Sequence, residues 1–136
     1  MNQFLIDHLE PVMAFDSRGT PTVSCETVLA GGARAGAIVP SGASTGGHEA
    51  VEMRDGGAEF AGRGVQRALA AIRGEIAHAV TGLDCRDQQA VDARMREVDG
   101  TAGLSRLGAN AVLAVSLSVA LAGAAQAGEQ PYRWFG

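Results

Sequence analysis

The chain has 136 residues, 46% of them hydrophobic, and a formal net charge of −4 at pH 7. This length suits one domain, since domains typically span about 100–150 residues, and it is too short for a barrel of about 250 residues. We therefore expect residues 1–136 to form a single domain. All 11 positive side chains are Arg and no Lys occurs, which excludes a P-loop and Schiff-base chemistry from this chain, because both require a Lys amine.

Composition also argues against several kinds of partner. Acidic and basic residues are interspersed and only 4% of residues are aromatic, so we expect no nucleic-acid partner. Cys25 and Cys85 lie far apart and form no zinc-ligand pattern, which favours a reduced, cytoplasmic protein. The N-terminus shows no signal-peptide pattern.

The first forty residues predict strands. Polar and apolar residues alternate over 21–30, and after the turn signal Gly31-Gly32 a second apolar run covers 33–39, as in a hairpin. Residues 12–15 are expected to add an edge strand, with Pro11 acceptable only at its start.

The remainder predicts helices. One helix is expected over 64–80, because Val65, Leu69, Ile72, Ile76 and Val80 recur at helical spacing. A second is expected to be capped by Asp87 and to end at Asp99-Gly100, with Val91, Met95 and Val98 as its buried stripe. A third is expected over 109–127, with Gly128 just beyond its end. Strands followed by helices indicate an α+β fold, a three-stranded antiparallel sheet followed by a helical cluster.

The third helix lies in an uncharged segment, 107–128, that is long enough to span a membrane. Its apolar content is mostly Ala and is interrupted by polar residues such as Asn110 and Ser118. We therefore expect a buried core helix and no membrane partner.

The stretch 40–57 is rich in Gly and Ser and has no periodicity, as in a long loop. Its glycine frame lacks the Lys of a P-loop, and its Gly-x-Ser-x-Gly pattern lacks the strand-turn-helix context of a nucleophile elbow. Two interpretations stay open: a solvated connection, or a lid whose N–H groups and hydroxyls meet a phosphate or Mg²⁺. His48 could be a ligand or a surface residue, whereas His8 and His78 are expected to be exposed. Arg18 could reach a partner subunit or substrate, or stabilise its turn.

Several blocks of sequence in order resemble the N-terminal domain of the enolase family (phosphopyruvate hydratase). They are Asp16-Ser17-Arg18-Gly19-x-Pro21-Thr22-Val23, Val39-Pro40-Ser41-Gly42-Ala43-Ser44-Thr45-Gly46, Glu49-Ala50-x-Glu52-x-Arg54-Asp55-Gly56, Asp99-Gly100-Thr101 and Leu107-Gly108-Ala109-Asn110-Ala111. The resemblance implies Mg²⁺-dependent removal of water from 2-phosphoglycerate to give phosphoenolpyruvate in glycolysis.

The resemblance also assigns roles to residues of this chain. It implies a substrate lid formed by Ser41, Gly42, Ala43, Ser44, Thr45 and Gly46, with Ser44 as a Mg²⁺ ligand. Arg18 is expected at a subunit interface of a homo-oligomer, where Ser24 replaces a Glu that the family uses in this contact.

In the family, the base is a Lys, the acid is a Glu, and these groups and most metal ligands lie on a C-terminal barrel. Gly136 falls where the family continues into that barrel, so we expect no catalytic residue in this chain and no turnover by the chain alone. Two alternatives to the lid domain of an enolase-like lyase stay open. The chain could be a non-catalytic interaction module, or part of a divergent paralogue that acts on a related phosphorylated or phosphonate acid.

Overall fold

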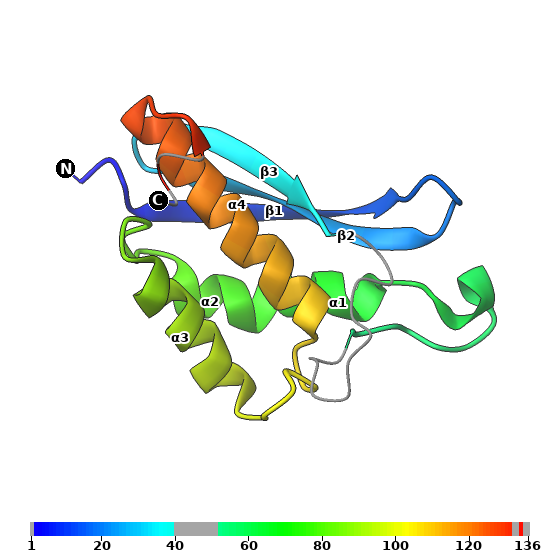
Figure 1. Cartoon of the computed structure of the whole chain (residues 1–136). Helices are drawn as coiled ribbons and strands as arrows, with labels where there is room; N and C mark the ends of the chain where they lie inside the picture. Colours follow the sequence, from blue (N-terminus) through cyan, green and yellow to red (C-terminus); the bar gives the residue numbers. More distant parts are fainter. Residues whose placement is uncertain (1, 40–51, 132–133, 135–136) are drawn as a thin grey trace.

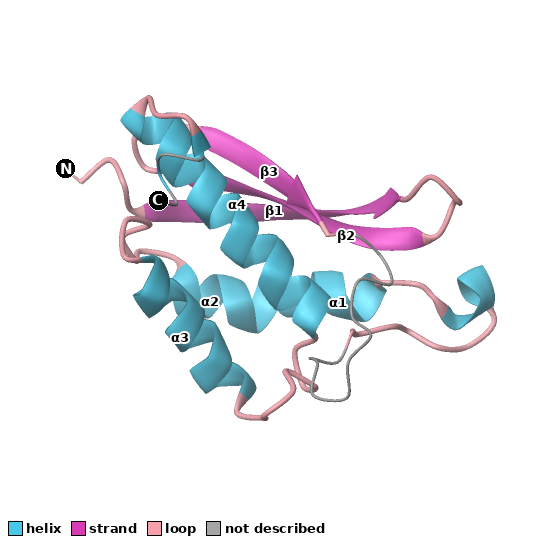
Figure 2. Cartoon of the chain, in the orientation of Figure 1, coloured by secondary structure: helices cyan, strands magenta, loops and turns pink. Residues whose placement is uncertain are grey.

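The computed structural model describes residues 2–39, 52–131 and 134. A three-stranded antiparallel sheet, in the order β1-β2-β3, is followed by helices that cover one of its faces (Figures 1 and 2). The strands are β1 (Ile6–Phe15), β2 (Pro21–Leu29) and β3 (Arg34–Ile38). The α+β fold with a three-stranded sheet and a helical cluster is therefore confirmed.

The first strand is longer than the sequence predicts. β1 begins at Ile6, so Pro11 lies in its middle, opposite Cys25, and not at its start. Pro is tolerated here because β1 is an edge strand, and every second N–H of an edge strand points away from its neighbour. The expectation that the strand covers only residues 12–15 was therefore wrong.

The alternation predicted for the hairpin is confirmed in β2. Val23, Cys25, Thr27 and Leu29 are buried against the helices, whereas the intervening residues are only half-buried on the opposite face. The sheet therefore has an inner face that forms the core and an outer face that faces away from the helices.

The predicted helix over 64–80 forms one continuous run with a change of pitch. It comprises α1 (Gln66–Ala71), a π-helical turn (Ile72–Ile76) and α2 (Ala77–Val80), preceded by a 3₁₀ turn (Glu59–Gly62). All five residues of its apolar stripe are buried. The π turn was not predicted, because its apolar residues Ile72 and Ile76 keep the i, i+4 spacing that is also typical of an α-helix.

The next helix, α3 (Gln88–Asp99), has the predicted ends. The Asp87 carboxylate accepts a hydrogen bond from the N–H of Ala90 at 3.1 Å, and Gly100 ends the helix with φ of +73°. Val91 and Met95 are fully buried, while Val98 is half-buried.

The last helix, α4 (Ala109–Ala127), packs against β2, β3 and α3. It is the one helix in the described part of the chain that is long and apolar enough to cross a membrane, and 61% of that span is buried inside the domain. Its Ser118 hydroxyl meets the Thr27 hydroxyl of β2 at 2.7 Å, with both groups fully buried. Burial against the sheet supports the prediction of a core helix.

Candidate functional site

The residues predicted to form the lid are not among those that the structure describes. This holds for His48 and for Ser41, Gly42, Ala43, Ser44, Thr45 and Gly46. The structure does describe the residues on either side of segment 40–51, and these show how its two ends are attached.

The entry to the segment is attached to β2. The Val39 N–H donates to the Val23 carbonyl at 2.9 Å, and the Thr22 hydroxyl donates to the Val39 carbonyl. Thr22 and Val39 are both buried. The backbone is therefore fixed up to the residue before Pro40.

The exit is attached to the first turn of α4. The Asn110 side chain accepts from the Met53 N–H at 2.9 Å and donates to the Met53 carbonyl at 3.0 Å. Gly108 lies beside this pair with φ of +100°, and a Cβ there would come within 2.4 Å of the Met53 Cβ. Only Gly allows the two backbones to approach so closely.

The residues after Met53 are also anchored. The Arg54 guanidinium donates to the carbonyls of Pro21 at 2.6 Å and Arg63 at 2.7 Å, and it pairs with the Glu52 carboxylate. These three acceptors satisfy donors on both terminal nitrogens of the guanidinium group. Arg54 thus joins the exit of the segment to the start of β2.

Asp55 completes this attachment. Its carboxylate accepts from the N–H groups of Gln66 and Arg67, each at 2.8 Å, and so caps the start of α1. The irregular stretch expected to reach Gly57 is therefore held in place from Glu52 onward. An acidic residue at a helix N-terminus also complements the helix dipole.

Sequence reasoning did not assign these anchoring roles. Asn110 was read only as a polar interruption of an apolar helix, although a buried amide in the first turn signals a backbone it must satisfy. Arg54 and Asp55 gave no local signal, because the backbone groups that they bind lie at least nine positions away in the sequence.

Arg18 lies in the turn between β1 and β2. The Asp16 carboxylate accepts from the backbone N–H groups of Arg18 at 2.8 Å and Thr20 at 2.9 Å. The Arg18 guanidinium is 3.8 Å from Asp16 and its side chain is 75% exposed. Asp16 therefore stabilises the turn, and the Arg18 side chain projects from it.

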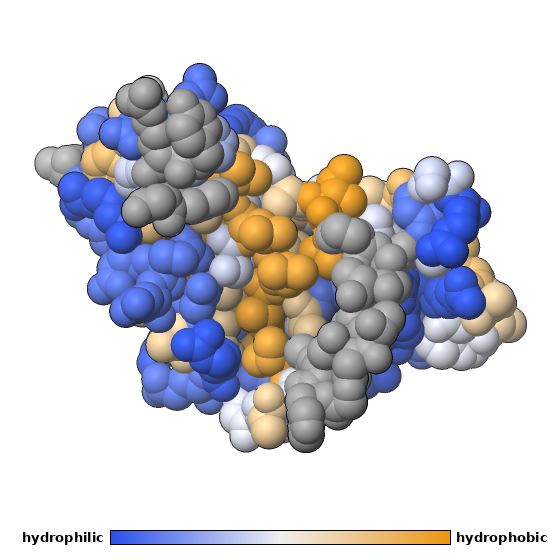
Figure 3. Space-filling view, in the orientation of Figure 1, coloured by the Kyte–Doolittle hydropathy of each residue, from blue (hydrophilic) through white to orange (hydrophobic). Residues whose placement is uncertain are grey.

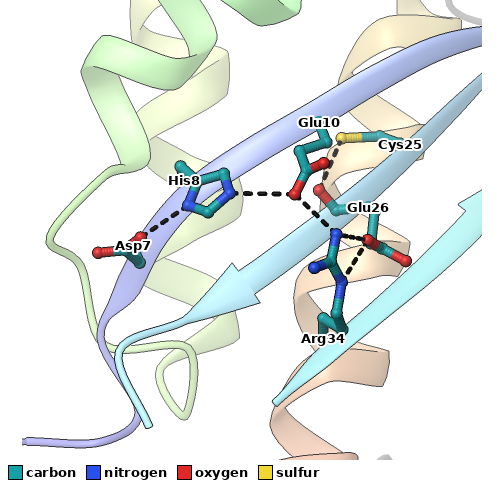
Figure 4. Close-up of polar contacts among 6 residues, drawn as sticks. All are labelled: Asp7, His8, Glu10, Cys25, Glu26 and Arg34. Atoms are coloured by element: carbon teal, nitrogen blue, oxygen red, sulfur yellow. Dashed lines mark hydrogen bonds and ion pairs between the residues drawn. The ribbon is translucent and has the colours of Figure 1, made fainter. Parts of the chain in front are cut away.

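Charged side chains gather on the outer face of the sheet (Figure 4). The His8 ring lies between Asp7 at 2.6 Å and Glu10 at 3.0 Å, and Arg34 lies between Glu10 and Glu26. The hydrogen bonds to Asp7 and Glu10 raise the pKa of His8 above its ordinary value. Each basic group is thus bridged between two carboxylates in an exposed network. His8 and His78 are both exposed, as predicted.

The described part of the chain offers no site for metal binding or for thiolate chemistry. No group of three or more His, Cys, Asp or Glu residues there could hold a metal ion, so these residues do not fit a Mg²⁺ site. Cys25 and Cys85 are buried and free, and burial raises the pKa of each thiol to about 11. Both thiols therefore stay protonated at neutral pH and are poor nucleophiles and ligands.

Comparison with known protein families gives one match that covers nearly all of these residues. The model of the family described as "Enolase, N-terminal domain" matches residues 6–135, which is nearly the whole chain. The sequence blocks that meet around Met53, Arg54 and Asn110 all lie within this match. The chain belongs to the enolase family and is its N-terminal domain.

Proposed function

We propose that this chain serves as the lid and subunit-interface domain of a cytoplasmic enolase-type lyase, which removes water from 2-phosphoglycerate to give phosphoenolpyruvate. The observation that carries the proposal is the family match over residues 6–135. The anchoring of Val39 and Met53, on either side of segment 40–51, supports it, because a segment that must reach a substrate gains precision when the residues that flank it are fixed.

The chemistry itself is assigned to the barrel domain that the family implies. Among the described residues, no group of three or more His, Cys, Asp or Glu could hold a metal ion, and no Lys occurs in the chain. We therefore expect the barrel to hold Mg²⁺, with Ser44 adding one oxygen ligand from this chain. A hydroxyl is a hard ligand of the kind that Mg²⁺ prefers.

The oligomer contact is assigned to the outer face of the sheet and the Arg18 turn. Val12, Ser24 and Ile38 lie in register across the three strands on this face. Val12 is 55% exposed and Ile38 is 60% exposed, and exposed apolar side chains that lie on one face are typical of a contact site. These apolar residues, together with Arg18 in the turn between β1 and β2, would stabilise contact with another subunit.

Reconstitution tests the proposal. The purified chain is mixed with the separately expressed barrel domain of an enolase-family enzyme, and conversion of 2-phosphoglycerate with Mg²⁺ is followed by absorbance of the product. We expect no turnover by the chain alone and turnover by the mixture above that of the barrel alone. A mixture no more active than the barrel would count against the lid role.

The Ser44 assignment has its own test. Ser44→Ala in the reconstituted enzyme should raise the Mg²⁺ concentration needed for half-maximal activity, whereas Ser41→Ala should leave that concentration unchanged. An equal Mg²⁺ requirement in both variants would remove Ser44 from the metal site.

A further inference from the structure

The two sides of the domain differ in surface character. Figure 3 shows a band of hydrophobic surface along α4 on the helical side of the domain. The outer face of the sheet carries instead, at one end, the charged side chains of Asp7, His8, Glu10, Glu26 and Arg34 that Figure 4 draws. We call these five residues the charged network. They lie where β1 departs from regular pairing with β2.

β1 contains a bulge at Asp7. Ile6 is paired with Leu29 and His8 with Val28, so β1 has one residue more than β2 between these two pairs. Side chains of a regular strand alternate between the two faces of the sheet, and a bulge interrupts this alternation. Ile6 is therefore buried in the core, whereas Asp7 and His8 are both exposed. The side chains of these two neighbouring residues meet at 2.6 Å.

The bulge separates two parts of the chain that have different backbone partners. The Ile6 N–H donates to the Leu83 carbonyl at 2.9 Å, and the Ile6 carbonyl accepts from the Gly82 N–H at 2.8 Å. Both partners lie in the loop that follows α2. From His8 onward, β1 pairs residue by residue with β2. Asp7 is thus the joint between a segment bound to this loop and a strand bound to the sheet.

The His8 ring connects this joint to the rest of the charged network. Its Nδ1 lies 2.6 Å from the Asp7 carboxylate, and its Nε2 lies 3.0 Å from Oε2 of Glu10. A neutral imidazole carries only one N–H donor, so both contacts are hydrogen bonds only when the ring is protonated. In the neutral ring, one nitrogen would present its lone pair to a carboxylate. The geometry by itself therefore favours the protonated ring.

Arg34 holds the other end of the charged network in place. Glu10 and Glu26 lie directly opposite each other on β1 and β2, and like charges in that position destabilise a sheet. The Arg34 guanidinium donates to both carboxylates, at 2.7 Å to Oε2 of Glu10 and at 2.6 Å to Glu26. Oε2 of Glu10 is thus shared between the His8 ring and β3. The ring therefore links the joint in β1 to all three strands.

We propose that Asp7, His8 and Glu10 form a proton-dependent clamp, in which the protonated ring holds the bulge of β1 against the charged network and loss of the ring proton releases it. Asp7 and Glu10 face the ring from its own strand, and Glu26 on β2 and Arg34 on β3 act on it through Glu10. The helices cover the opposite face of the sheet (Figure 1). This inference concerns the domain alone and does not depend on the proposed function.

The direction of the effect follows from the pKa of His8. The hydrogen bonds to Asp7 and Glu10 raise this pKa above its ordinary value. A group with a raised pKa stabilises the fold below its unfolded-state pKa, about 6.5 for His, and this contribution is lost as pH rises through the folded-state pKa. The clamp is therefore formed in mildly acidic solution and broken in alkaline solution. Because the His8 side chain is 50% exposed, the effect is local and modest.

Titration of the His8 ring by NMR tests the pairing. The titration midpoint should lie above 6.5 in the parent chain. It should fall in Asp7→Asn and in Glu10→Gln, because each substitution removes one negative charge beside the ring. Glu97→Gln, which changes an exposed carboxylate on α3, should leave the midpoint unchanged. A parent midpoint at or below 6.5, or a midpoint that either Asp7→Asn or Glu10→Gln leaves unchanged, would overturn the clamp.

Amide hydrogen exchange tests whether the joint is released. Protection of the Ile6 N–H, corrected for the intrinsic pH dependence of exchange, should fall about two- to fivefold between about pH 5.5 and about pH 9, as expected for an exposed ion pair. The Asp16 N–H, which donates to the Thr20 carbonyl at the opposite end of β1, should keep its protection.

His8→Gln provides the matched control for the exchange experiment. This variant should show no fall in Ile6 protection over the same pH range, and circular dichroism checks that it is folded. A parent chain with equal Ile6 protection at both pH values, or a fall that persists in His8→Gln, would overturn the clamp. An equal fall at Ile6 and Asp16 would show that the ring stabilises the whole domain and not the joint, and would overturn it as well.

Discussion

The side chain of Asn110 binds both backbone groups of Met53, accepting from its N–H at 2.9 Å and donating to its carbonyl at 3.0 Å. The amide thereby satisfies the N–H and the carbonyl of Met53, as the backbone of a neighbouring strand would. The residue after Met53, Arg54, donates to the Pro21 carbonyl at 2.6 Å. The start of α4 is therefore connected through Met53 and Arg54 to the start of β2.

Replacing Asn110 tests the strength of this attachment. Asn110→Ala leaves a part-buried N–H and carbonyl of Met53 without their partner, and the free energy of unfolding should fall by about 1–3 kcal/mol. Asn110→Asp keeps the acceptor but turns a buried carboxylate oxygen toward the Met53 carbonyl, so at pH 7 it should cost at least as much. Urea unfolding followed by circular dichroism measures both; an Asn110→Ala variant as stable as the parent chain would show that water replaces the amide without cost.

Gly108 should be intolerant of any side chain. Gly108→Ala combines a positive φ with a Cβ only 2.4 Å from the Met53 Cβ, and it should destabilise the domain by about 2–5 kcal/mol. Gly57 also has a positive φ, of +75°, but nothing lies within 4 Å of a Cβ there. Gly57→Ala should therefore cost only about 1–2 kcal/mol, and equal losses in thermal unfolding would contradict the close approach.

The Asp99 carboxylate binds the loop that precedes α4, and we expect its protonation to lower the stability of the domain in acid. Burial by itself raises the pKa of this carboxyl, but hydrogen bonds from Thr101 and from the Leu107 N–H at 2.7 Å outweigh it and lower the pKa below its ordinary value. A group with a lowered pKa stabilises the fold above its unfolded-state pKa, and this contribution is lost as pH falls through the folded-state pKa.

The unfolding free energy should therefore decrease as the pH falls below about 4, the ordinary pKa of Asp. Asp99→Asn should lower stability at pH 7 by about 1–3 kcal/mol and flatten this dependence, because the charged acceptor is gone. Urea unfolding at a series of pH values checks both effects. An Asp99→Asn variant with the parent's pH dependence would assign the acid sensitivity to other carboxylates.

Replacing Arg18 tests whether its side chain serves a subunit interface or stabilises the turn between β1 and β2. Its guanidinium is mostly exposed and 3.8 Å from Asp16, and exposed ion pairs contribute little, so Arg18→Ala should change monomer stability by no more than about 0.5 kcal/mol. The same variant should weaken association of the reconstituted enzyme in analytical ultracentrifugation. Asp16→Ala provides the contrast, because it removes the acceptor of two turn N–H groups and should destabilise the monomer.

The sequence by itself determined the features that depend on neighbouring residues. The alternation in β2, the apolar stripe from Val65 to Val80, the Asp87 cap and the glycine after α4 were all predicted, since each is a local periodicity or a local hydrogen bond. The ordered family blocks added the enolase N-terminal domain, which the family match then confirmed.

The tertiary structure decided the features that join distant parts of the chain. Extension of β1 through Pro11 depends on its pairing as an edge strand with β2, and the contacts of Asn110 with Met53 and of Arg54 with Pro21 cross 57 and 33 positions of sequence. Which side of α4 is buried could not be read from the sequence, because that helix is apolar on every side and has no amphipathic pattern. Packing against the sheet selected the buried side and left Leu113 exposed.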